Sequence, residues 1–486
     1  MLLHVTSLPG AGKNGELGED AFQFIDFLAS CGIKMWQVLP LGPTMSDLSP
    51  YQSTSAHAGN PDLISIEALN KKEWFVKDEF SKFSESIASD EEEKTAWLKF
   101  AYLQFNSNAD TKSINDFQQF CVDKSDWLHE YALYAAIKNN FENKSWVDWP
   151  KELRNRNDSA LAIAREEYFT EIEYVKFVQF IFHQQWMALK QYANSKEIKV
   201  FGDLPLFVSH DSADVWADKQ LFKLDGEGQL LFVAGVPPDY FSETGQRWGN
   251  PVYDWVSHEA DSFNWWIKRL ENQFELFDYV RIDHFRGLES YWEIPAEHET
   301  ALQGYWVTAP GKKMLSAVEK HFGLHSGKKL PLIAEDLGVI TDDVVALKED
   351  FQLPGMKILQ FAFGGDSSNP YLPHNHEIDS VVYTGTHDNN TTLGWFNELS
   401  DEDKSHVYRY YESNESMPWL LMRSAYASVA NIVVLPMQDL MGLDVKGRMN
   451  VPGTAEGNWL WRFEWKDLDK PAVIKYMNIL NGLYGR

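Results

Sequence analysis

Cysteines are scarce in this chain of 486 residues, since only Cys31 and Cys121 are present. They lie far apart in the sequence and lack the close spacing of a metal-binding pair. We therefore expect two reduced thiols, and neither a disulfide nor a cysteine-bound metal.

Basic residues are also few, because 44 Lys and Arg stand against 71 Asp and Glu, which gives a formal net charge of −27. Such a charge repels nucleic acid and anionic membrane surfaces. No stretch reaches the roughly 18 consecutive apolar residues of a membrane-spanning helix. The first residues show no basic region followed by an apolar run, so we expect a cytoplasmic protein without nucleic-acid or membrane partners.

Two common motifs are missing as well. The sequence contains no P-loop, and the nucleophile elbow G-x-S-x-G is absent. P-loop nucleotide binding and serine hydrolysis therefore have no support in the sequence.

Short apolar segments, by contrast, recur along the whole chain. Most are continuous rather than alternating, which is typical of parallel strands covered on both faces. Such a series predicts an α/β fold, a (β/α)8 TIM barrel, whose active site lies at the carboxyl ends of the strands. The eight predicted strands are residues 2–5, 35–39, 200–206, 279–282, 330–334, 356–363, 381–383 and 432–435.

The intervals between these strands predict crossover helices and two insertions in one catalytic unit spanning 1–486. Residues 20–30 and 341–350 have the apolar face or acidic start of a crossover helix. Residues 44–199 contain several helical patterns, most clearly within 166–192, and predict a mainly helical insertion after the second strand. A second insertion, 209–278, carries a long aromatic loop at 236–251, which is a candidate for a lid. The chain after the eighth strand is too short for a further β-sandwich domain.

Three acids follow predicted strands four, five and seven. They are Asp283, Glu335 and Asp388, and the carboxyl ends of barrel strands share one mouth. Two carboxyl groups about 5 Å apart suffice for retaining glycoside chemistry, in which one attacks the anomeric carbon and the other protonates the leaving oxygen. Arg281 is expected to stabilise the carboxylate form of Asp283, which suits a nucleophile. Glu335, if it faces an apolar wall, should keep its proton, which suits an acid.

Other interpretations of these residues stay open at this point. Acids at strand ends are often helix caps or solvated turn residues. A catalytic metal site is a second alternative, although His4 on the first predicted strand is not part of a His-x-His pair and no His-Glu-x-x-His helix is present. That metal site would use His4, His284, His387 and Asp388.

Two segments combine aromatic rings with amide side chains. They are Tyr51 with Gln52, and Gln246 with Trp248. Sugar rings present apolar faces and a rim of hydroxyl groups, which match such pairs. Turns in a protein core can show the same pattern.

Taken together, the motifs resemble the bacterial amylomaltases, which are 4-α-glucanotransferases also called disproportionating enzymes. The resemblance extends from the first residues to the last thirty, and no single motif carries it. The matching segments are residues 3–10, 36–44, 49–61, 202–205, 236–251, 281–287, 334–338, 386–390 and 451–461.

The resemblance implies a (β/α)8 barrel of the α-amylase clan with helical insertions, no C-terminal β-sandwich domain, and no metal or organic cofactor. It implies transfer of an α-1,4-glucan segment to the 4-hydroxyl of an acceptor sugar. Asp283 would be the nucleophile, Glu335 the general acid/base and Asp388 the stabiliser of the transition state. The residues implied to bind α-1,4-glucans and maltooligosaccharides are Tyr51, Asp203, Asp239, Tyr240, Phe241, Gln246, Trp248, Arg281, His387 and Asn450.

Two other activities would use the same residues. One is hydrolysis of α-1,4-glucans by the same retaining mechanism, and the other is glycan binding without catalysis. A monomer and a homodimer are both compatible with the sequence.

Overall fold

The computed structural model describes residues 1–10, 12–84, 92–238, 242–324, 329–454 and 456–486. Three residues that the resemblance places near bound glucan, Asp239, Tyr240 and Phe241, lie outside this part of the chain.

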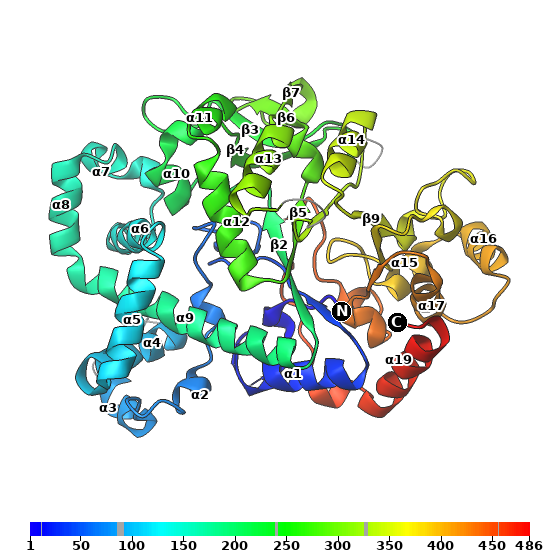
Figure 1. Cartoon of the computed structure of the whole chain (residues 1–486), viewed down its shortest axis with the longest axis horizontal. Coiled ribbons are helices and arrows are strands. Elements are labelled where there is room, and N and C mark those ends of the chain that lie inside the picture. Colours follow the sequence, from blue (N-terminus) through cyan, green and yellow to red (C-terminus); the bar gives the residue numbers. More distant parts are fainter. Residues whose placement is uncertain (11, 85–91, 239–241, 325–328, 455) are drawn as a thin grey trace.

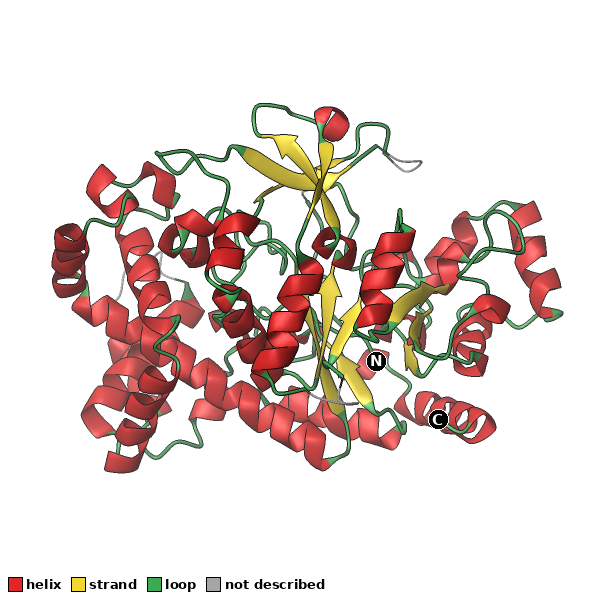
Figure 2. Ribbon diagram, turned by 45° about the horizontal axis from the view of Figure 1, so that its top comes forward, coloured by secondary structure: helices red, strands yellow, loops and turns green. Residues whose placement is uncertain are grey.

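Parallel strands form the centre of the molecule (Figures 1 and 2). One sheet has the order β1-β2-β5-β8, and a second has the order β11-β10-β9. Every pairing within these two sheets is parallel. Their bounds are β1 Met35–Gln37, β2 Lys199–Pro205, β5 Tyr279–Asp283, β8 Leu332–Ala334, β9 Gly355–Ile358, β10 Ser380–Tyr383 and β11 Ile432–Val434.

Two joints close these sheets into a barrel. The N–H of Ala334 at the end of β8 donates to the carbonyl oxygen of Pro354, just before β9, at 2.8 Å. Leu2 forms parallel bridges to Gln37, the last residue of β1, and to Pro436 after β11. Leu2 therefore takes the place of the first strand, and the (β/α)8 barrel is confirmed.

Several predicted strands are shorter than expected, two of them by three or more residues. The strand predicted at residues 2–5 is reduced to the bridge at Leu2, because a 3-10 helix, η1, follows at Val5–Ser7. The strand predicted at 356–363 ends at Ile358, where the 3-10 helix η8 begins, Leu359–Phe361. Both changes occur at the carboxyl ends, where the chain leaves the barrel.

A buried apolar cluster lies beneath the polar ends of the strands. It includes Phe201, Ile333, Val381 and Tyr383, all almost completely inaccessible to solvent. Because alternate residues of a strand share a face, Asp203 lies on the same face as Phe201. Inside the barrel, a layer of charged side chains therefore lies on a layer of buried apolar side chains.

The predicted crossover helices are present. Helix α1, Glu19–Ser30, ends before Gly32, whose φ of +67° is readily adopted by glycine. Helix α14, Asp342–Asp350, starts with two aspartates at its positive end.

The interval between β1 and β2 is mostly helical and lies at one side of the barrel. Its long helix α9 runs from this helical region to the barrel (Figure 1). The helix predicted within 166–192 is interrupted at Tyr168, which separates α8 from α9. The helices of this interval are α2 Ile66–Leu69, α3 Phe80–Ser84, α4 Glu93–Asn108, α5 Thr111–Asp123, α6 Leu128–Asn140, α7 Lys151–Arg154, α8 Asp158–Glu167 and α9 Phe169–Ser195.

A small antiparallel sheet lies above the carboxyl ends of β2 and β5 (Figure 2). Its order is β4-β3-β6-β7. The described parts of the predicted loop 236–251 include its strand β4, so that prediction of a loop was wrong for those residues. The strands are β3 Phe232–Val236, β4 Gln246–Pro251, β6 Ser290–Pro295 and β7 Tyr305–Thr308.

The remaining helices pack around these sheets. They include α10 Ala213–Ala217, α11 Trp255–Ala260, α12 Asn264–Leu276, α13 Gly311–His321, α15 Thr392–Glu398, α16 Asp401–Tyr411, α17 Trp419–Ala427, α18 Met437–Leu440 and α19 Lys470–Tyr484.

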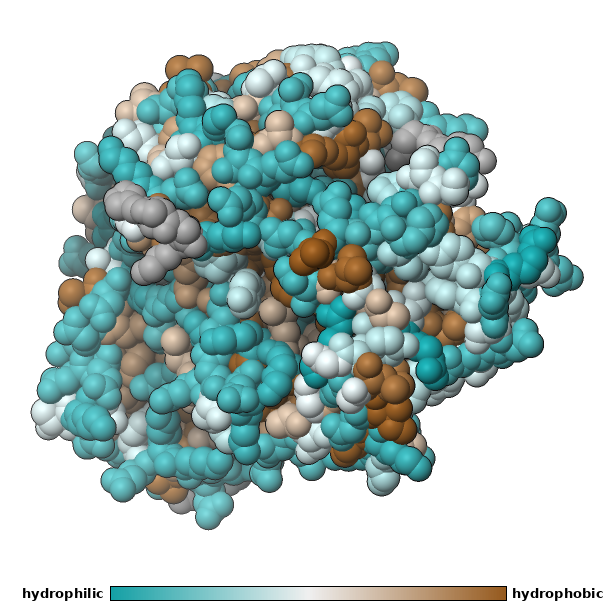
Figure 3. Space-filling model, turned by 45° about the vertical axis from the view of Figure 1, so that its right-hand side comes forward, coloured by the Kyte–Doolittle hydropathy of each residue, from teal (hydrophilic) through white to brown (hydrophobic). Residues whose placement is uncertain are grey.

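The face drawn in Figure 3 is mostly hydrophilic, and its apolar residues form separate small patches. Within the described ranges, no helix combines the length and apolar character needed to cross a membrane. Cys31 and Cys121 are both free.

Candidate active site

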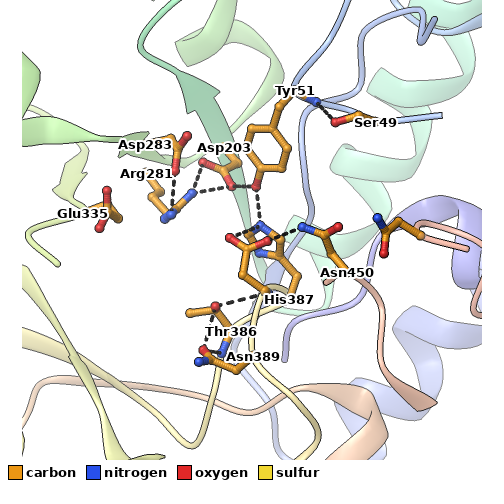
Figure 4. Close-up of polar contacts among 12 residues, drawn as sticks. Ser49, Tyr51, Asp203, Arg281, Asp283, Glu335, Thr386, His387, Asn389 and Asn450 are labelled. Atoms are coloured by element: carbon orange, nitrogen blue, oxygen red, sulfur yellow. Dashed lines mark hydrogen bonds and ion pairs between the residues drawn. The ribbon is translucent and has the colours of Figure 1, made fainter. Parts of the chain in front are cut away.

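Arg281 of β5 joins two carboxylates at the mouth of the barrel (Figure 4). Its Nη1 donates to both carboxylate oxygens of Asp203, at 2.8 and 2.7 Å. Its Nη2 lies 2.7 Å from Oδ1 of Asp283. Since only 5% of the Arg281 side chain is exposed, these interactions occur largely out of water.

Tyr51 connects this group to His387. Its hydroxyl donates to Oδ2 of Asp203 at 2.7 Å and lies 2.8 Å from Nε2 of His387. A hydroxyl carries one hydrogen, so the contact with His387 requires Nε2 of the histidine to be the donor. The two rings are also stacked, with centroids 5.4 Å apart.

Asp388 is held beside His387 by residues near the end of the chain. Nε2 of His387 lies 3.3 Å from Oδ2 of Asp388, and the amide of Asn450 donates to Oδ1 at 2.6 Å. Arg448 donates to the backbone oxygen of Asp388 at 3.0 Å. Residues that follow β10 and β11 are thereby brought to the carboxylates of β2 and β5.

Glu335 follows β8 and is fixed by two backbone donors. Oε2 accepts from the N–H of His284 at 2.7 Å, and Oε1 accepts from the N–H of Leu337 at 3.0 Å. His284 has a φ of +55°, the left-handed region, which turns its N–H toward the neighbouring strand end.

Strand register places Glu335 beside Asp283. Ile282 of β5 pairs with Ala334 of β8, so the next residue on each strand is an acid. Neighbouring strands lie about 5 Å apart. Figure 4 shows Glu335 on the side of Arg281 away from His387 and Asp283 next to Arg281.

The pKa values of the two acids are raised to different extents. Burial raises the pKa of Glu335 to about 7, and the charge of Asp283 adds to this effect although Arg281 opposes it. Burial also raises the pKa of Asp283 to about 6, more than the neighbouring Arg281 lowers it. Arg281 thus stabilises the carboxylate form of Asp283, as expected, but burial outweighs it and the net pKa is raised. Glu335 still has the higher pKa.

Aromatic rings flank the acids on two sides. On one side, the ring of Trp459 lies 5.9 Å from Tyr51 and 6.0 Å from His387. On the other, Trp248 of β4 meets the ring of His284 edge-on at 4.8 Å. The indole N–H of Trp248 donates to Oε1 of Gln246 at 3.0 Å.

The structure thus brings most of the predicted residues to one place. Asp203, Arg281 and Asp283 form one ionic group, Tyr51 and His387 link it to Asp388 and Asn450, and Glu335 adjoins it. Sequence reasoning did not single out Arg448 and Trp459. The recognised segment 451–461 was the available signal, because Trp459 lies inside it and Arg448 lies three residues before it.

The alternative metal site is not formed by the described residues. Within them, no group of three or more His, Cys, Asp or Glu side chains is arranged to hold a metal ion. His4 is 7% exposed, and burial lowers its pKa to about 3.

This arrangement has the groups that retaining glycoside chemistry needs. Two adjacent carboxyl groups differ in pKa, a third carboxylate lies across from them, and aromatic rings stand on both sides. Such chemistry requires one ionised carboxylate and one protonated carboxyl group at a time.

Comparisons with known proteins agree with one another. A family model described as 4-alpha-glucanotransferase matches residues 3–468. The 4-alpha-glucanotransferase of Synechocystis sp. is 46% identical over 496 residues, covering 100% of this chain and 97% of the relative. That of Thermus thermophilus is 46% identical over 475 residues, with 95% and 94% covered.

Solved structures give the same result. The amylomaltase from Streptococcus agalactiae, solved in complex with acarbose, superposes with a TM-score of 0.93 at 37% identity, covering 100% of this chain and 98% of that one. The amylomaltase from Corynebacterium glutamicum shares the fold, with a TM-score of 0.78 at 15% identity over 100% and 75% of the two chains.

Proposed function

The chain belongs to the 4-α-glucanotransferase family, and from this premise we propose that Asp283, Glu335 and Asp388 perform its reaction. The enzyme transfers a segment of an α-1,4-glucan to an acceptor sugar. The proposal for the residues rests on one observation above all, the strand register that makes Asp283 and Glu335 neighbours at the barrel mouth.

In the first step, a carboxylate oxygen of Asp283 attacks the anomeric carbon of the donor. Glu335 gives its proton to the departing glycosidic oxygen, so that the C–O bond breaks and a covalent glucosyl-enzyme forms. Arg281 holds Asp283 by one oxygen at 2.7 Å, which orients the carboxylate for attack.

In the second step, Glu335 takes the proton of the acceptor 4-hydroxyl, which displaces Asp283 from the anomeric carbon. Two inversions give net retention. Asp388, held by Asn450 and next to His387, would stabilise the positive charge that develops on the sugar ring in both transition states.

Transfer must compete with water, which is present at about 55 M. Well-oriented groups can reach effective molarities of about 10⁵ M or more, so an acceptor sugar held in line can outcompete water. Tyr51 and Trp248 are the aromatic residues that we propose hold the sugars. The S. agalactiae amylomaltase was solved in complex with acarbose, which supports the proposal that this chain binds oligosaccharides.

Maltotriose should be converted to glucose plus a ladder of longer maltooligosaccharides. Each transfer makes one glycosidic bond for every bond broken, so the total number of reducing ends should stay constant. Thin-layer chromatography and a reducing-end assay on the same samples measure both quantities. A steady rise in reducing ends would instead indicate the alternative, a retaining α-1,4-glucan hydrolase.

The pH dependence of kcat/KM for maltotriose should be bell-shaped. Asp283 must be ionised to attack, so the rate should rise as pH increases through about 6. Glu335 must be protonated to act as an acid, so the rate should fall above about 7. Because the carboxyl groups interact, the two limbs report apparent values of the pair. Initial rates from about pH 4 to about pH 9 test this, and a flat profile between about 5 and 8 would contradict it.

We further propose that residues 1–486 form a single catalytic unit, with 44–199 and 209–278 as insertions, the second of which carries the active-site segment 236–251. The net charge of −27 supports the absence of nucleic-acid partners, and the two free cysteines support a cytoplasmic location. A monomer and a homodimer both fit the proposal.

A further inference from the structure

Arg286 lies three residues after the proposed nucleophile and outside its ionic network. Its relative exposure is 5%, and among the described residues it forms no ion pair with a carboxylate. A buried guanidinium needs other partners. Nη1 donates to the backbone oxygen of Val339, and Nη2 lies 3.2 Å from Oγ of Ser290.

The bond to Val339 is the last of a series that joins the two catalytic strand ends. Beyond the β5–β8 ladder, the N–H of Glu335 donates to Ile282 at 3.1 Å, and the N–H of Phe285 donates to the backbone oxygen of Glu335 at 3.2 Å. The N–H of His284 donates to the Glu335 carboxylate. Arg286 extends this series to the loop that follows Glu335, residues 336–339.

That loop supplies one of the two donors to the Glu335 carboxylate. The N–H of Leu337 binds Oε1, and Val339, two residues further, is 58% exposed. The start of the loop is held separately, because Asp336 accepts from the N–H of Met356 and from Lys348. Arg286 therefore holds the far side of the turn that presents Leu337.

The guanidinium is itself held in one plane. Its centre lies 3.8 Å from the ring centroid of Trp306 on β7, and this tryptophan pairs across the sheet with Trp292 of β6. Stacking on an aromatic ring while donating to two acceptors suits the planar fork of arginine and not the point charge of lysine.

We propose that Arg286 is a positioning residue that orients the Glu335 carboxyl group as proton donor through Val339 and Leu337. The inference rests on the proposed function, because it assigns Glu335 the role of acid. It explains why a second arginine follows the nucleophile without contacting it.

A comparison of two donors tests this role. Maltotriose needs protonation of its leaving oxygen, whereas fluoride leaves α-maltotriosyl fluoride without it, so only the first donor depends on a well-placed acid. Arg286→Ala should lower kcat on maltotriose by about 10-fold to about 100-fold, with KM changed less than about threefold. The single-turnover burst of fluoride release should stay within about threefold of the parent enzyme.

Two more measurements separate positioning from general damage. Loss of the Leu337 bond removes a donor to the ionised form of Glu335, so the alkaline limb of the pH profile should move to higher pH in Arg286→Ala. Arg286→Lys keeps the positive charge and a hydrogen-bond donor, and it should recover part of the lost kcat. Arg156→Ala is a matched control, because Arg156 also stacks on a tryptophan, Trp216 at 4.2 Å, but lies in the helical insertion.

The outcomes are distinct. The inference would be overturned if Arg286→Ala lost the same rate with maltotriose and with α-maltotriosyl fluoride, or if its turnover of maltotriose were unchanged. Glu335→Ala, measured in parallel, tests the underlying function. If Glu335→Ala loses the same rate with maltotriose and with α-maltotriosyl fluoride, the proposed role of Glu335 as the acid is refuted, independently of Arg286. If Arg286→Ala does not fold, as judged by thermal melting, Trp306→Ala carries the same comparison.

Discussion

Asp283→Asn should lower the turnover of maltotriose by at least about 10⁴-fold, because an amide oxygen cannot displace the glycosidic oxygen to give a stable ester. Binding of maltooligosaccharides should change little. Tyr51, Trp248 and Asn450 remain, and Arg281 still has two bonds to Asp203 that hold its position. Steady-state kinetics and calorimetric titration with maltotriose measure the two quantities.

The control for Asp283→Asn is a similar substitution away from the site. Asp366 is an exposed residue whose carboxylate accepts from Ser368 in its own turn. Asp366→Asn should retain the activity of the parent enzyme. Retention of more than about 1% of activity by Asp283→Asn, after contamination by parent enzyme is excluded, would rule out Asp283 as the nucleophile.

Glu335→Gln should slow transfer from maltotriose by about 10²-fold to about 10⁴-fold, the range expected for loss of a general acid/base. The amide keeps the size of the side chain but cannot deliver the proton. With α-maltotriosyl fluoride, the first step needs no acid, while the second step lacks its base. The covalent glucosyl-enzyme should therefore accumulate.

Intact-protein mass spectrometry measures this adduct, and peptide mapping locates it. The label should lie on the peptide that contains Asp283. The double variant Asp283→Asn with Glu335→Gln should give no adduct. A label on another acid would contradict the assigned roles. So would a Glu335→Gln variant that loses the same rate with maltotriose and with α-maltotriosyl fluoride.

The strand order and the acids at strand ends were predictable because both are local features. A strand buried on both faces is a continuous apolar run, and the acid follows directly where the chain reaches water. Asp283, Glu335 and Asp388 could therefore be assigned to three strand ends. The family resemblance added Asp203 and Asn450, which no local pattern distinguishes.

Other features escaped prediction for physical reasons. The sheet of β3, β4, β6 and β7 was missed because its first two strands contain glycine and proline, which usually indicate loops. The length of the first strand was overestimated, because a single bridge from Leu2 to each neighbouring strand is enough to close the barrel. The net pKa of Asp283 could not be predicted, because the neighbour Arg281 is visible in the sequence whereas burial is not.

The chain's own pattern of apolar runs, acids and recognised motifs was enough to establish a barrel, its family and its three catalytic candidates, since each depends on short-range order. Contacts between distant residues could not be read in this way. The closure through Leu2, the link from Tyr51 to His387 and the position of Arg286 between Val339 and Trp306 depend on how segments separated by tens to hundreds of residues pack. Burial, which sets Glu335 above Asp283 in pKa, arises from that same packing.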